Sequence, residues 1–287
     1  MNKPLCAVWV VTYNQRDFIS QTIESIVQQK TNFRFKVYIG DDCSTDGTRE
    51  ICIKYKALYP ELIELVFNSV NHMQQNSMNV YNACFGSGAK YTAMCEGDDY
   101  WADPNKLQTQ VDFLEAHPEF SGCFHNTEER YEQDKSKSSF LYCNFPSARA
   151  ISFNDLCYAN IIPTCSVVFR NNLFDKFPER YFKLRLGDWT LHLLNAQFGD
   201  FWYIPRIMAV HRLHNKSTWM LQDANKNRQS TIEAYDEMIS GFGFDEKFTG
   251  YLKIAKEVFI NSGNFRTPKP GVKSKAKHLM IRLIEKL

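Results

Sequence analysis

Short apolar runs alternate with segments of helical periodicity through the first 125 residues, and this alternation limits the folds open to the chain more than any other feature. Four runs have the length and apolar character of buried strands: residues 6–11, 37–39, 62–67 and 91–95. The segments between them place apolar side chains on one helical face: residues 18–27, 51–58 and 76–85. Strands that alternate with helices form parallel sheets with crossover connections, so we predict an α/β fold with a Rossmann-like first half.

The second half of the chain is expected to extend this sheet and then to become helical. Helices are predicted over residues 104–117 and 188–198, and further strands over three runs: residues 121–125, 166–169 and 201–204. The polar stretch 126–138 is expected to be a surface loop or hairpin with no packing role. From about Trp219 the chain is helical and polar, so we divide it into a main domain, residues 1–219, and a helical appendage, residues 220–287.

Composition narrows the class of protein. The 287 residues are 44% hydrophobic and 23% charged, which is enough apolar material for a substantial core. The formal net charge of +2 does not favour a nucleic-acid binder. The nine cysteines are odd in number, have no C-x-x-C spacing and are typical of a reducing compartment. No signal peptide and no apolar stretch of about 18 residues is recognisable, so we expect a cytoplasmic protein.

Two adjacent carboxylates, Asp98 and Asp99, follow the apolar run 91–95 and precede Tyr100 and Trp101. Like charges side by side repel and need a cation, and carboxylate oxygens prefer hard ions such as Mg²⁺ or Mn²⁺. An ion held by one or two carboxylates completes its shell with water and substrate phosphate, so the pair predicts a metal-bridged diphosphate. The alternative is a solvated acidic turn, because turns favour Asp. The two aromatic residues are expected to pack rather than to bind ligand.

Two further polar turns are expected at the same edge of the sheet. Residues 10–14 (VVTYN) end the first predicted strand, and residues 41–48 (DDCSTDGT) end the second. Ligands bind outside the carboxyl ends of parallel strands in open α/β sheets, so both turns should face one crevice with the acidic pair. The alternative for the second turn is a loop in which Ser44 and Asp46 cap the next helix.

In this order and spacing, the three motifs resemble the successive signatures of family 2 glycosyltransferases, and the resemblance covers residues 5 to about 215. It implies a GT-A fold, with a mixed, mainly parallel sheet flanked by helices. It also implies an inverting transfer of a sugar from a nucleotide-diphosphate donor, with a UDP-sugar favoured and Mn²⁺ or Mg²⁺ as cofactor. The implied acceptor is a hydroxyl of a polysaccharide, a lipopolysaccharide or a lipid-linked glycan.

The resemblance implies nucleotide-binding roles for residues of the first two turns. Asp42 is expected to accept a hydrogen bond from the nucleotide base, and a carboxylate acceptor makes this bond charge-assisted. Asp41 is assigned to nucleotide binding beside it. Thr12, Tyr13 and Asn14 are expected to flank the base and the ribose.

The implied metal and diphosphate ligands come from two parts of the sequence. Asp99 is expected to contact the ion, while Asp98 reaches the ribose or the water shell of the ion and is assigned to both nucleotide and metal. In the run 211–214 (HRLH), where His211 replaces the usual Tyr, His214 is predicted as a further metal ligand and Arg212 as a diphosphate clamp. A surface position is the alternative for His214, because H-x-x-H alone is no zinc signature.

Asp188, in the run 186–189 (LGDW), resembles the catalytic base of the family. An inverting transfer needs one carboxylate that removes the proton of the attacking hydroxyl. The alternative is a helix N-cap, and the two roles are compatible. The run 163–166 (PTCS) resembles a region that contacts acceptor or sugar and receives no role here.

A basic amphipathic helix is predicted at the carboxyl end of the chain, over residues 268–287. It has an apolar stripe and five cationic residues: Lys273, Lys275, Lys277, Arg282 and Lys286. Such a helix can lie on the anionic inner face of the cytoplasmic membrane, close to lipid-linked acceptors. It can equally pack on the main domain with its lysines in water.

Other function classes fit the residues less well. A sugar-nucleotide pyrophosphorylase would need a glycine-rich phosphate loop after the first strand, and residues 12–16 contain no glycine. A dinucleotide dehydrogenase fails because G-x-G-x-x-G is absent from that position. A nucleotide- or carbohydrate-binding scaffold that has lost turnover is the non-enzymatic alternative, against which the acids at 98, 99 and 188 argue.

Overall fold

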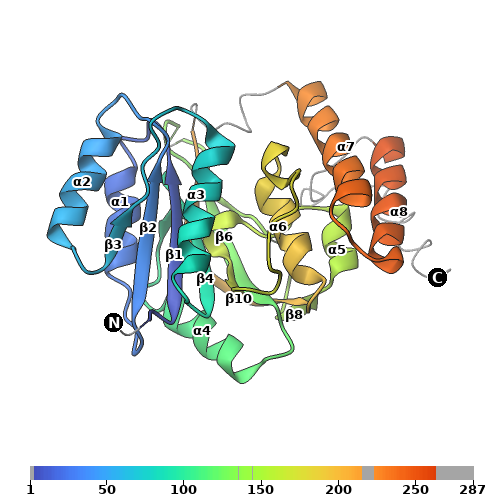
Figure 1. Cartoon of the computed structure of the whole chain (residues 1–287), viewed down its shortest axis with the longest axis horizontal. Helices are drawn as coiled ribbons and strands as arrows, with labels where there is room; N and C mark the ends of the chain where they lie inside the picture. The colour runs from blue at the N-terminus through green and yellow to red at the C-terminus, as the bar shows by residue number, and fades with distance from the viewer. Residues whose placement is uncertain (1–2, 135, 144, 215–222, 263–287) are drawn as a thin grey trace.

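The computed structural model describes residues 3–134, 136–143, 145–214 and 223–262, and Figure 1 shows a central sheet with helices on both faces. The strands are β1 (Cys6–Thr12), β2 (Phe35–Asp41), β3 (Ile63–Leu65), β4 (Tyr91–Glu96), β5 (Tyr100–Trp101), β6 (Gly122–Tyr131), β7 (Phe140–Leu141), β8 (Arg149–Ile151), β9 (Val168–Arg170) and β10 (Phe201–Leu213). The helices are α1 (Ile19–Val27), α2 (Thr48–Leu58), α3 (Met73–Gly86), α4 (Lys106–Ala116), α5 (Phe153–Tyr158), α6 (Gly187–Ala196), α7 (Ala224–Gly241) and α8 (Glu246–Ser262). Two 3-10 turns are η1 (Thr164–Ser166) and η2 (Tyr181–Lys183).

The first half of the sheet is parallel, as predicted. Strand β1 pairs with β2 and β4, and β2 pairs with β3, all in parallel register. Because side chains alternate along a strand, the two faces of β1 enter different clusters. Val8 and Val10 join the apolar faces of α1, α2 and α4, whereas Ala7 and Trp9 pack with α3. Because β1, β2, β3 and β4 run parallel, their carboxyl ends lie at the same edge of the sheet, and the polar turns lie there.

The second half makes the sheet mixed. Strand β9 runs antiparallel to both β4 and β6, while β10 runs parallel to β6, and the order across the sheet is β3-β2-β1-β4-β9-β6-β10-β5. Strand β10 is much longer than the predicted run 201–204 and continues to Leu213 past a change of register near Pro205. Proline lacks the N–H that a sheet ladder needs, which accounts for an irregularity there. The predicted α/β class with a mixed sheet is confirmed.

The prediction of a surface loop over residues 126–138 is wrong in its first half. Strand β6 continues to Tyr131 and pairs with the last part of β10. Thr127 is fully buried and Glu129 is 4% exposed. Polar residues in a strand resemble a loop on hydrophobic pattern alone, and buried polar groups of this kind are kept where they have partners. Here Glu129 has its partner, His211, on the neighbouring strand β10, at the edge of the sheet that carries the candidate site.

Helices α7 and α8 pack beside α5 and α6, at the end of the molecule farthest from α2 in Figure 1. The Tyr235 hydroxyl donates to the Cys157 carbonyl at 2.6 Å, and its ring meets the ring of Trp189 edge-on. The predicted division at residues 219 and 220 falls in the undescribed segment 215–222 and stays a prediction. The predicted amphipathic helix 268–287 also lies outside the described residues. Within the described part of the chain, no helix is long and apolar enough to cross a membrane.

Candidate active site

The turns after β1 and β2 are tied together by hydrogen bonds between residues about 30 positions apart. The Asn14 backbone N–H donates to Ser44 Oγ at 2.9 Å, and the Thr45 N–H donates to Asn14 Oδ1 at 2.9 Å. Asn14 has a left-handed backbone (φ 51°), a conformation that Asn adopts more readily than most residues. Thr12 is buried, whereas Tyr13 is 49% exposed. The tyrosine ring is therefore open to a ligand beside two turns that fix one another.

The two candidate caps of α2 divide their roles. Asp46 Oδ1 accepts the N–H of Thr48, the first residue of α2, at 3.0 Å, while its Oδ2 accepts the Arg16 N–H. Ser44 instead accepts from the first turn. The N-cap position of α2 is Gly47, so neither Asp46 nor Ser44 is the N-cap. Asp46 accepts the first N–H of the helix from the position before the N-cap, and Ser44 joins the two turns.

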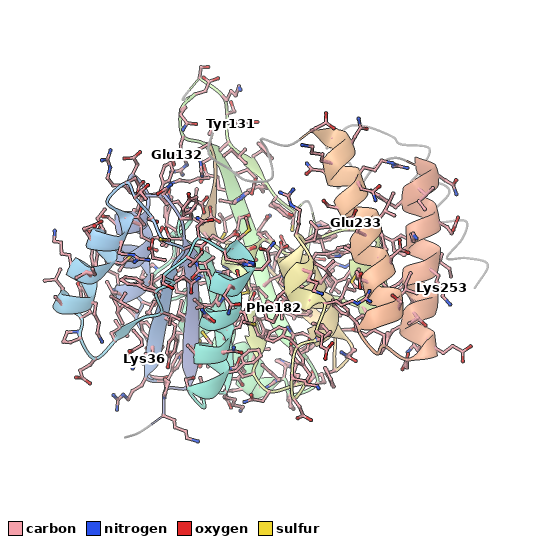
Figure 2. All side chains as sticks on the ribbon, turned by 45° about the horizontal axis from the view of Figure 1, so that its top comes forward. Lys36, Tyr131, Glu132, Phe182, Glu233 and Lys253 are labelled. Carbon is pink, nitrogen blue, oxygen red and sulfur yellow. The ribbon has the colours of Figure 1, made fainter. Side chains whose placement is uncertain are left out.

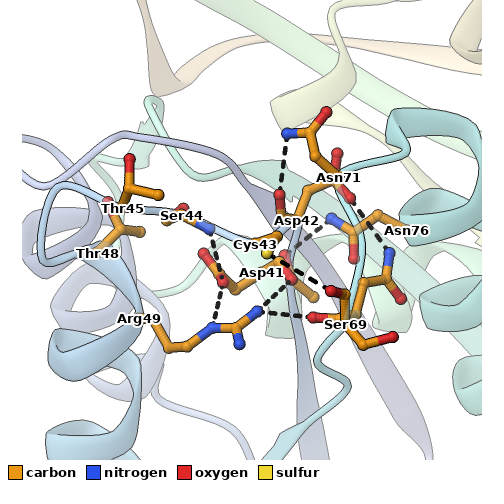
Figure 3. A network of polar contacts seen from close by, with 12 residues as sticks. Asp41, Asp42, Cys43, Ser44, Thr45, Thr48, Arg49, Ser69, Asn71 and Asn76 are labelled. Atoms are coloured by element: carbon orange, nitrogen blue, oxygen red, sulfur yellow. Dashed lines mark hydrogen bonds and ion pairs between the residues drawn. The ribbon is translucent and has the colours of Figure 1, made fainter.

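Figure 3 shows that the adjacent acids Asp41 and Asp42 have different partners. Asp41 is fully buried, and its Oδ2 accepts from Arg49 Nε at 2.6 Å. Asp42 Oδ1 accepts from the His72 N–H at 2.8 Å and from Asn68 Nδ2 at 3.3 Å. Arg49 also donates to the Asn68 carbonyl at 2.8 Å. Asp41 thus holds the turn from below, through an ion pair, while Asp42 joins the turn to the segment that enters α3.

The acidic turn after β4 is held against the end of β10. Asp99 Oδ1 accepts the Arg212 backbone N–H at 2.9 Å, and Asp98 Oδ2 lies 3.0 Å from His214 Nε2. The turn also passes close to the first turn, because a Cβ atom on Gly97 would lie 2.7 Å from the Cβ atom of Thr12. Only glycine permits this approach. The three predicted motifs and the run 211–214 therefore meet at one place.

Arg212 is buried beneath the acidic turn, with 2% of its side chain exposed. Its guanidinium donates to Glu132 Oε1 at 2.9 Å, to the Asp98 carbonyl and to Gln21 Oε1, and lies over the ring of Tyr100. Glu132 follows the end of β6, in the upper part of the view in Figure 2. Arginine at this position supports the turn in the structure, and a direct contact with diphosphate stays a prediction.

His211 forms an ion pair with Glu129, which the prediction of a loop over residues 126–138 did not anticipate. Its Nδ1 lies 2.8 Å from Glu129 Oε2. Burial by itself lowers the pKa of His211, but the carboxylates of Asp99, Glu129 and Glu96 outweigh it and raise the pKa well above the usual value. A positive charge therefore lies among the acids of the site.

The acidic turn suits a divalent ion that is completed by substrate. Asp99 Oδ2 is buried and has no hydrogen-bond partner among the described residues, and burial raises the pKa of Asp99 to about 6. Across the described ranges, no three His, Cys, Asp or Glu side chains are grouped so as to hold an ion. The predicted set of Asp98, Asp99 and His214 is therefore not arranged as a complete shell. Mg²⁺ and Mn²⁺ commonly bind through one or two carboxylates plus phosphate oxygens, and the two acids fit that mode.

A cavity of about 150 Å³ opens beside the acidic turn, and Glu96 and Asp188 both line it. Its other walls come from β1, α3, β4 and the segment 164–187: Trp9, Val11, Met73, Gln74, Ser77, Tyr81, Met94, Thr164, Tyr181, Phe182, Leu184, Arg185 and Gly187. Burial, together with the charges of Asp98, Asp99 and Asp188, raises the pKa of Glu96 well above its ordinary value. The predicted base, Asp188, is therefore close enough to the acids at the end of β4 to interact with them electrostatically.

Asp188 lies in the first turn of α6 and is oriented by a neighbour outside the helix. Its Oδ2 accepts from Asn160 Nδ2 at 2.6 Å, and the Asn160 carbonyl accepts from the Tyr142 hydroxyl at 2.9 Å. Asn160 Oδ1 is buried and has no partner in the part of the chain described. One carboxylate oxygen of Asp188 is thus fixed by a donor.

Sequence reasoning missed Glu96 and Asn160. Glu96 precedes the acidic pair in the same motif, so its position at a strand end could have indicated it. Asn160 is a single polar residue in an otherwise apolar run that leads to residues 163–166, and only its contact with Asp188 marks it. Thr164, in that unassigned run, lines the cavity. The predicted packing role of Trp101 agrees with its burial and with its donation to the Cys165 carbonyl at 2.9 Å.

Comparison with known proteins places these features in a family. The model of glycosyl transferase family 2 matches residues 7–177. The chain therefore belongs to glycosyltransferase family 2, a class of sugar-transferring enzymes that the fold and the acidic edge of the sheet had already indicated. It is 33% identical to uncharacterized protein Rv1520 of Mycobacterium tuberculosis, over 84% of this chain and 70% of that protein. It is also 35% identical to the putative teichuronic acid biosynthesis glycosyltransferase TuaG of Bacillus subtilis, over 39% of this chain and 42% of that protein.

Solved structures share the fold at low sequence identity. Residues 1–349 of Staphylococcus aureus TarS, crystallised with UDP, superpose with a TM-score of 0.63 over 89% of this chain and 72% of that one, at 17% identity. The mannosyltransferase PcManGT of Pyrobaculum calidifontis, in complex with GDP-Man and Mn²⁺, gives a TM-score of 0.59 over 100% of this chain and 81% of that one, at 14% identity. The predicted GT-A type of fold is thus confirmed.

Proposed function

We propose that this protein transfers a sugar, with inversion, from a nucleotide-diphosphate sugar to a hydroxyl of a surface glycan or a lipid-linked glycan. The observation that carries the proposal is the cavity whose walls include both Glu96, at the start of the acidic motif, and Asp188. A reacting sugar in this space would have the acidic turn on one side and a separate carboxylate on the other. The likeness to TuaG supports an acceptor of the surface-glycan kind.

The donor would bind across the first three turns. Tyr13 offers an exposed ring to the base or ribose, with Thr12 and Asn14 shaping the turn beneath it. Asp42 would accept from the base, and Asp41 would support it through Arg49. Structures of the same fold hold UDP and GDP-Man, so a nucleotide-sugar donor is well supported and a UDP-sugar remains our preferred assignment.

The diphosphate would lie at the acidic turn. Asp98 and Asp99 would hold Mn²⁺ or Mg²⁺, and His214 would complete the set after its contact with Asp98 is exchanged. When bound, the ion supplies positive charge that stabilises the departing nucleotide diphosphate. Arg212 holds the Asp99 carboxylate through its backbone N–H and the backbone of the turn through the Asp98 carbonyl. It also adds a fixed positive charge, which stabilises a developing anion.

Asp188 would act as the base. Its Oδ2 is held by Asn160, so its orientation is set before any acceptor arrives. The acceptor hydroxyl would lose its proton to Asp188 as its oxygen attacks the sugar carbon, and the bond to the diphosphate would break on the opposite face. Because the leaving group is already activated, the protein has to supply position, charge and one proton acceptor.

Thermal unfolding with nucleotides tests the donor part of this proposal. UDP, GDP and dTDP are each added with and without Mn²⁺, because a ligand that binds only the folded state raises the melting temperature. We expect one nucleotide to give a shift that needs the ion and is lost in Asp99→Ala. The Asp134→Ala variant, which alters an exposed acid outside the site, should keep the shift. No shift with any nucleotide would contradict the proposal.

A further inference from the structure

A second cavity continues the proposed acceptor side along α3. It has a volume of about 330 Å³, within the range of small-molecule sites. Its wall consists of Met78, Asn82, Phe85, Asn172, Asp175, Lys176, Phe177 and Phe182. Phe182 is shared with the cavity that Asp188 lines. It belongs to η2, which contacts α3, and Figure 2 labels it. The two cavities are therefore neighbours with one common wall.

Helix α3 gives both cavities a continuous floor. Residues 73, 74, 77 and 81 face the first cavity, and residues 78, 82 and 85 face the second. At 3.6 residues per turn the two sets occupy adjoining sectors of the helix surface. From 73 to 85 they span about 18 Å along the helix, at 1.5 Å rise per residue, which is longer than one pyranose ring.

The lining of the second cavity suits a sugar. Three partly buried phenylalanine rings, at 85, 177 and 182, pack on one another and form an apolar part of the lining, against which the C–H face of a pyranose can pack. Asn82, Asn172 and Asp175 add carboxamide and carboxylate groups that can donate to and accept from hydroxyls.

A hydrocarbon chain suits the same cavity less well. Four of the eight lining residues are polar, namely Asn82, Asn172, Asp175 and Lys176. An isoprenoid would remove these groups from water without giving them partners, which costs free energy. Asp175 and Lys176 also carry opposite charges, so the cavity has no net preference for an anion.

We propose that this second cavity, lined by α3 and the segment 172–182, is a subsite for the penultimate sugar of an oligosaccharide acceptor. The inference rests on the proposed transferase function and refines its acceptor. The terminal sugar would place its hydroxyl at Asp188, and the next sugar would lie on Phe182 and reach Asn82. The enzyme would therefore prefer acceptors of two or more sugars over monosaccharides.

The test measures binding of the purified full chain to an array of bacterial mono-, di- and trisaccharides. Asn82→Trp fills the second cavity without altering the residues assigned to donor or base. Lys183→Trp is the matched control, because Lys183 is exposed, belongs to η2 and lines neither cavity. We expect wild type and Lys183→Trp to bind di- or trisaccharides, and Asn82→Trp to bind them at least about tenfold more weakly.

Three outcomes would overturn the inference. The first is that wild type prefers no oligosaccharide over monosaccharides, and the second is that Asn82→Trp binds as wild type does. The third is that Asn82→Trp loses binding to polyprenyl phosphate in micelles and keeps saccharide binding, which would make the lipid the occupant. The metal-dependent nucleotide shift separates this failure from that of the proposed function. A shift that persists in all variants leaves the transferase intact, whereas its absence from wild type contradicts the function itself.

Discussion

The nucleotide side and the acceptor side of the site are built differently. On the nucleotide side, contiguous motifs follow β1, β2 and β4, and their backbone amides and short polar side chains bind one another. On the acceptor side, Glu96, Thr164 and Asp188 come from three separate segments and line one cavity, and Asn160, four residues before Thr164, contacts Asp188. A site at the ends of adjacent strands leaves a readable pattern, whereas a site assembled from distant loops does not.

The largest effect should come from the acceptor side, with Asp188→Asn. The amide keeps the shape but cannot take a proton, so we expect the rate of transfer to fall by about 10³-fold. Nucleotide binding should persist, since the donor turns do not include this residue. Steady-state transfer with a UDP- or GDP-sugar, together with the nucleotide melting shift, checks both halves. Retained turnover would contradict the assignment of the base.

On the nucleotide side, Arg49→Met should lower the free energy of unfolding. The change leaves the fully buried Asp41 carboxylate without its cationic partner, and breaking a buried pair costs about 3 kcal/mol or more. The control is Lys36→Met, which removes the more exposed pair with Glu64 and should cost at most about 1 kcal/mol. Urea unfolding measures both. Equal losses in the two variants would show that Asp41 does not depend on Arg49.

Lys106 offers a further test on the nucleotide side, because it is a buried cation without a carboxylate partner in the described part of the chain. Its Nζ lies 4.1 Å from the centre of the Trp101 ring and has no hydrogen-bond partner among the described residues. Burial lowers the pKa of Lys106 from 10.5 to about 8. Between these two pH values the unfolded chain binds more protons, so the contribution of Lys106 to stability rises with pH. The cost of burying the charge, about 3 kcal/mol, is full below pH 8 and absent above 10.5.

Lys106→Met should therefore be more stable than wild type at pH 7, and this advantage should shrink as the pH rises from 8 to 10.5. The difference in free energy of unfolding between the variant and wild type reports on Lys106 alone, because both proteins contain the same titrating cysteines. Urea unfolding at a series of pH values measures it, with the exposed Lys54→Met as control. A difference that is independent of pH would contradict a charged, buried Lys106.

The smallest effect should follow Asn160→Ala, again on the acceptor side. Loss of the donor to Asp188 Oδ2 frees the carboxylate to rotate, and we expect kcat to fall about tenfold because orientation contributes to the rate. The KM for the donor and the nucleotide melting shift should change little. Restoration of kcat in Asn160→Gln would favour a positioning role. A loss of stability with unchanged kcat would assign Asn160 to the fold alone.

Prediction from the sequence succeeded where patterns are local. The parallel half of the sheet, the helices between its strands and the meeting of three motifs follow from periodicity and from the turn residues that end each strand. It failed at β6, because Thr127 and Glu129 are polar yet buried, and a pattern of hydrophobicity assigns such residues to a loop. Their burial is compensated by partners such as His211, which is more than 80 positions away.

By itself, then, the sequence determined the fold class, the family and the three acidic or polar turns, because strand and helix periods and turn chemistry act between near neighbours. Only the tertiary structure decided that Glu129 pairs with His211, that Asn160 holds Asp188 and that α3 carries two adjoining cavities. Those contacts join residues 28 to 82 positions apart, and such pairs are brought together by the packing of the whole core rather than by any local preference.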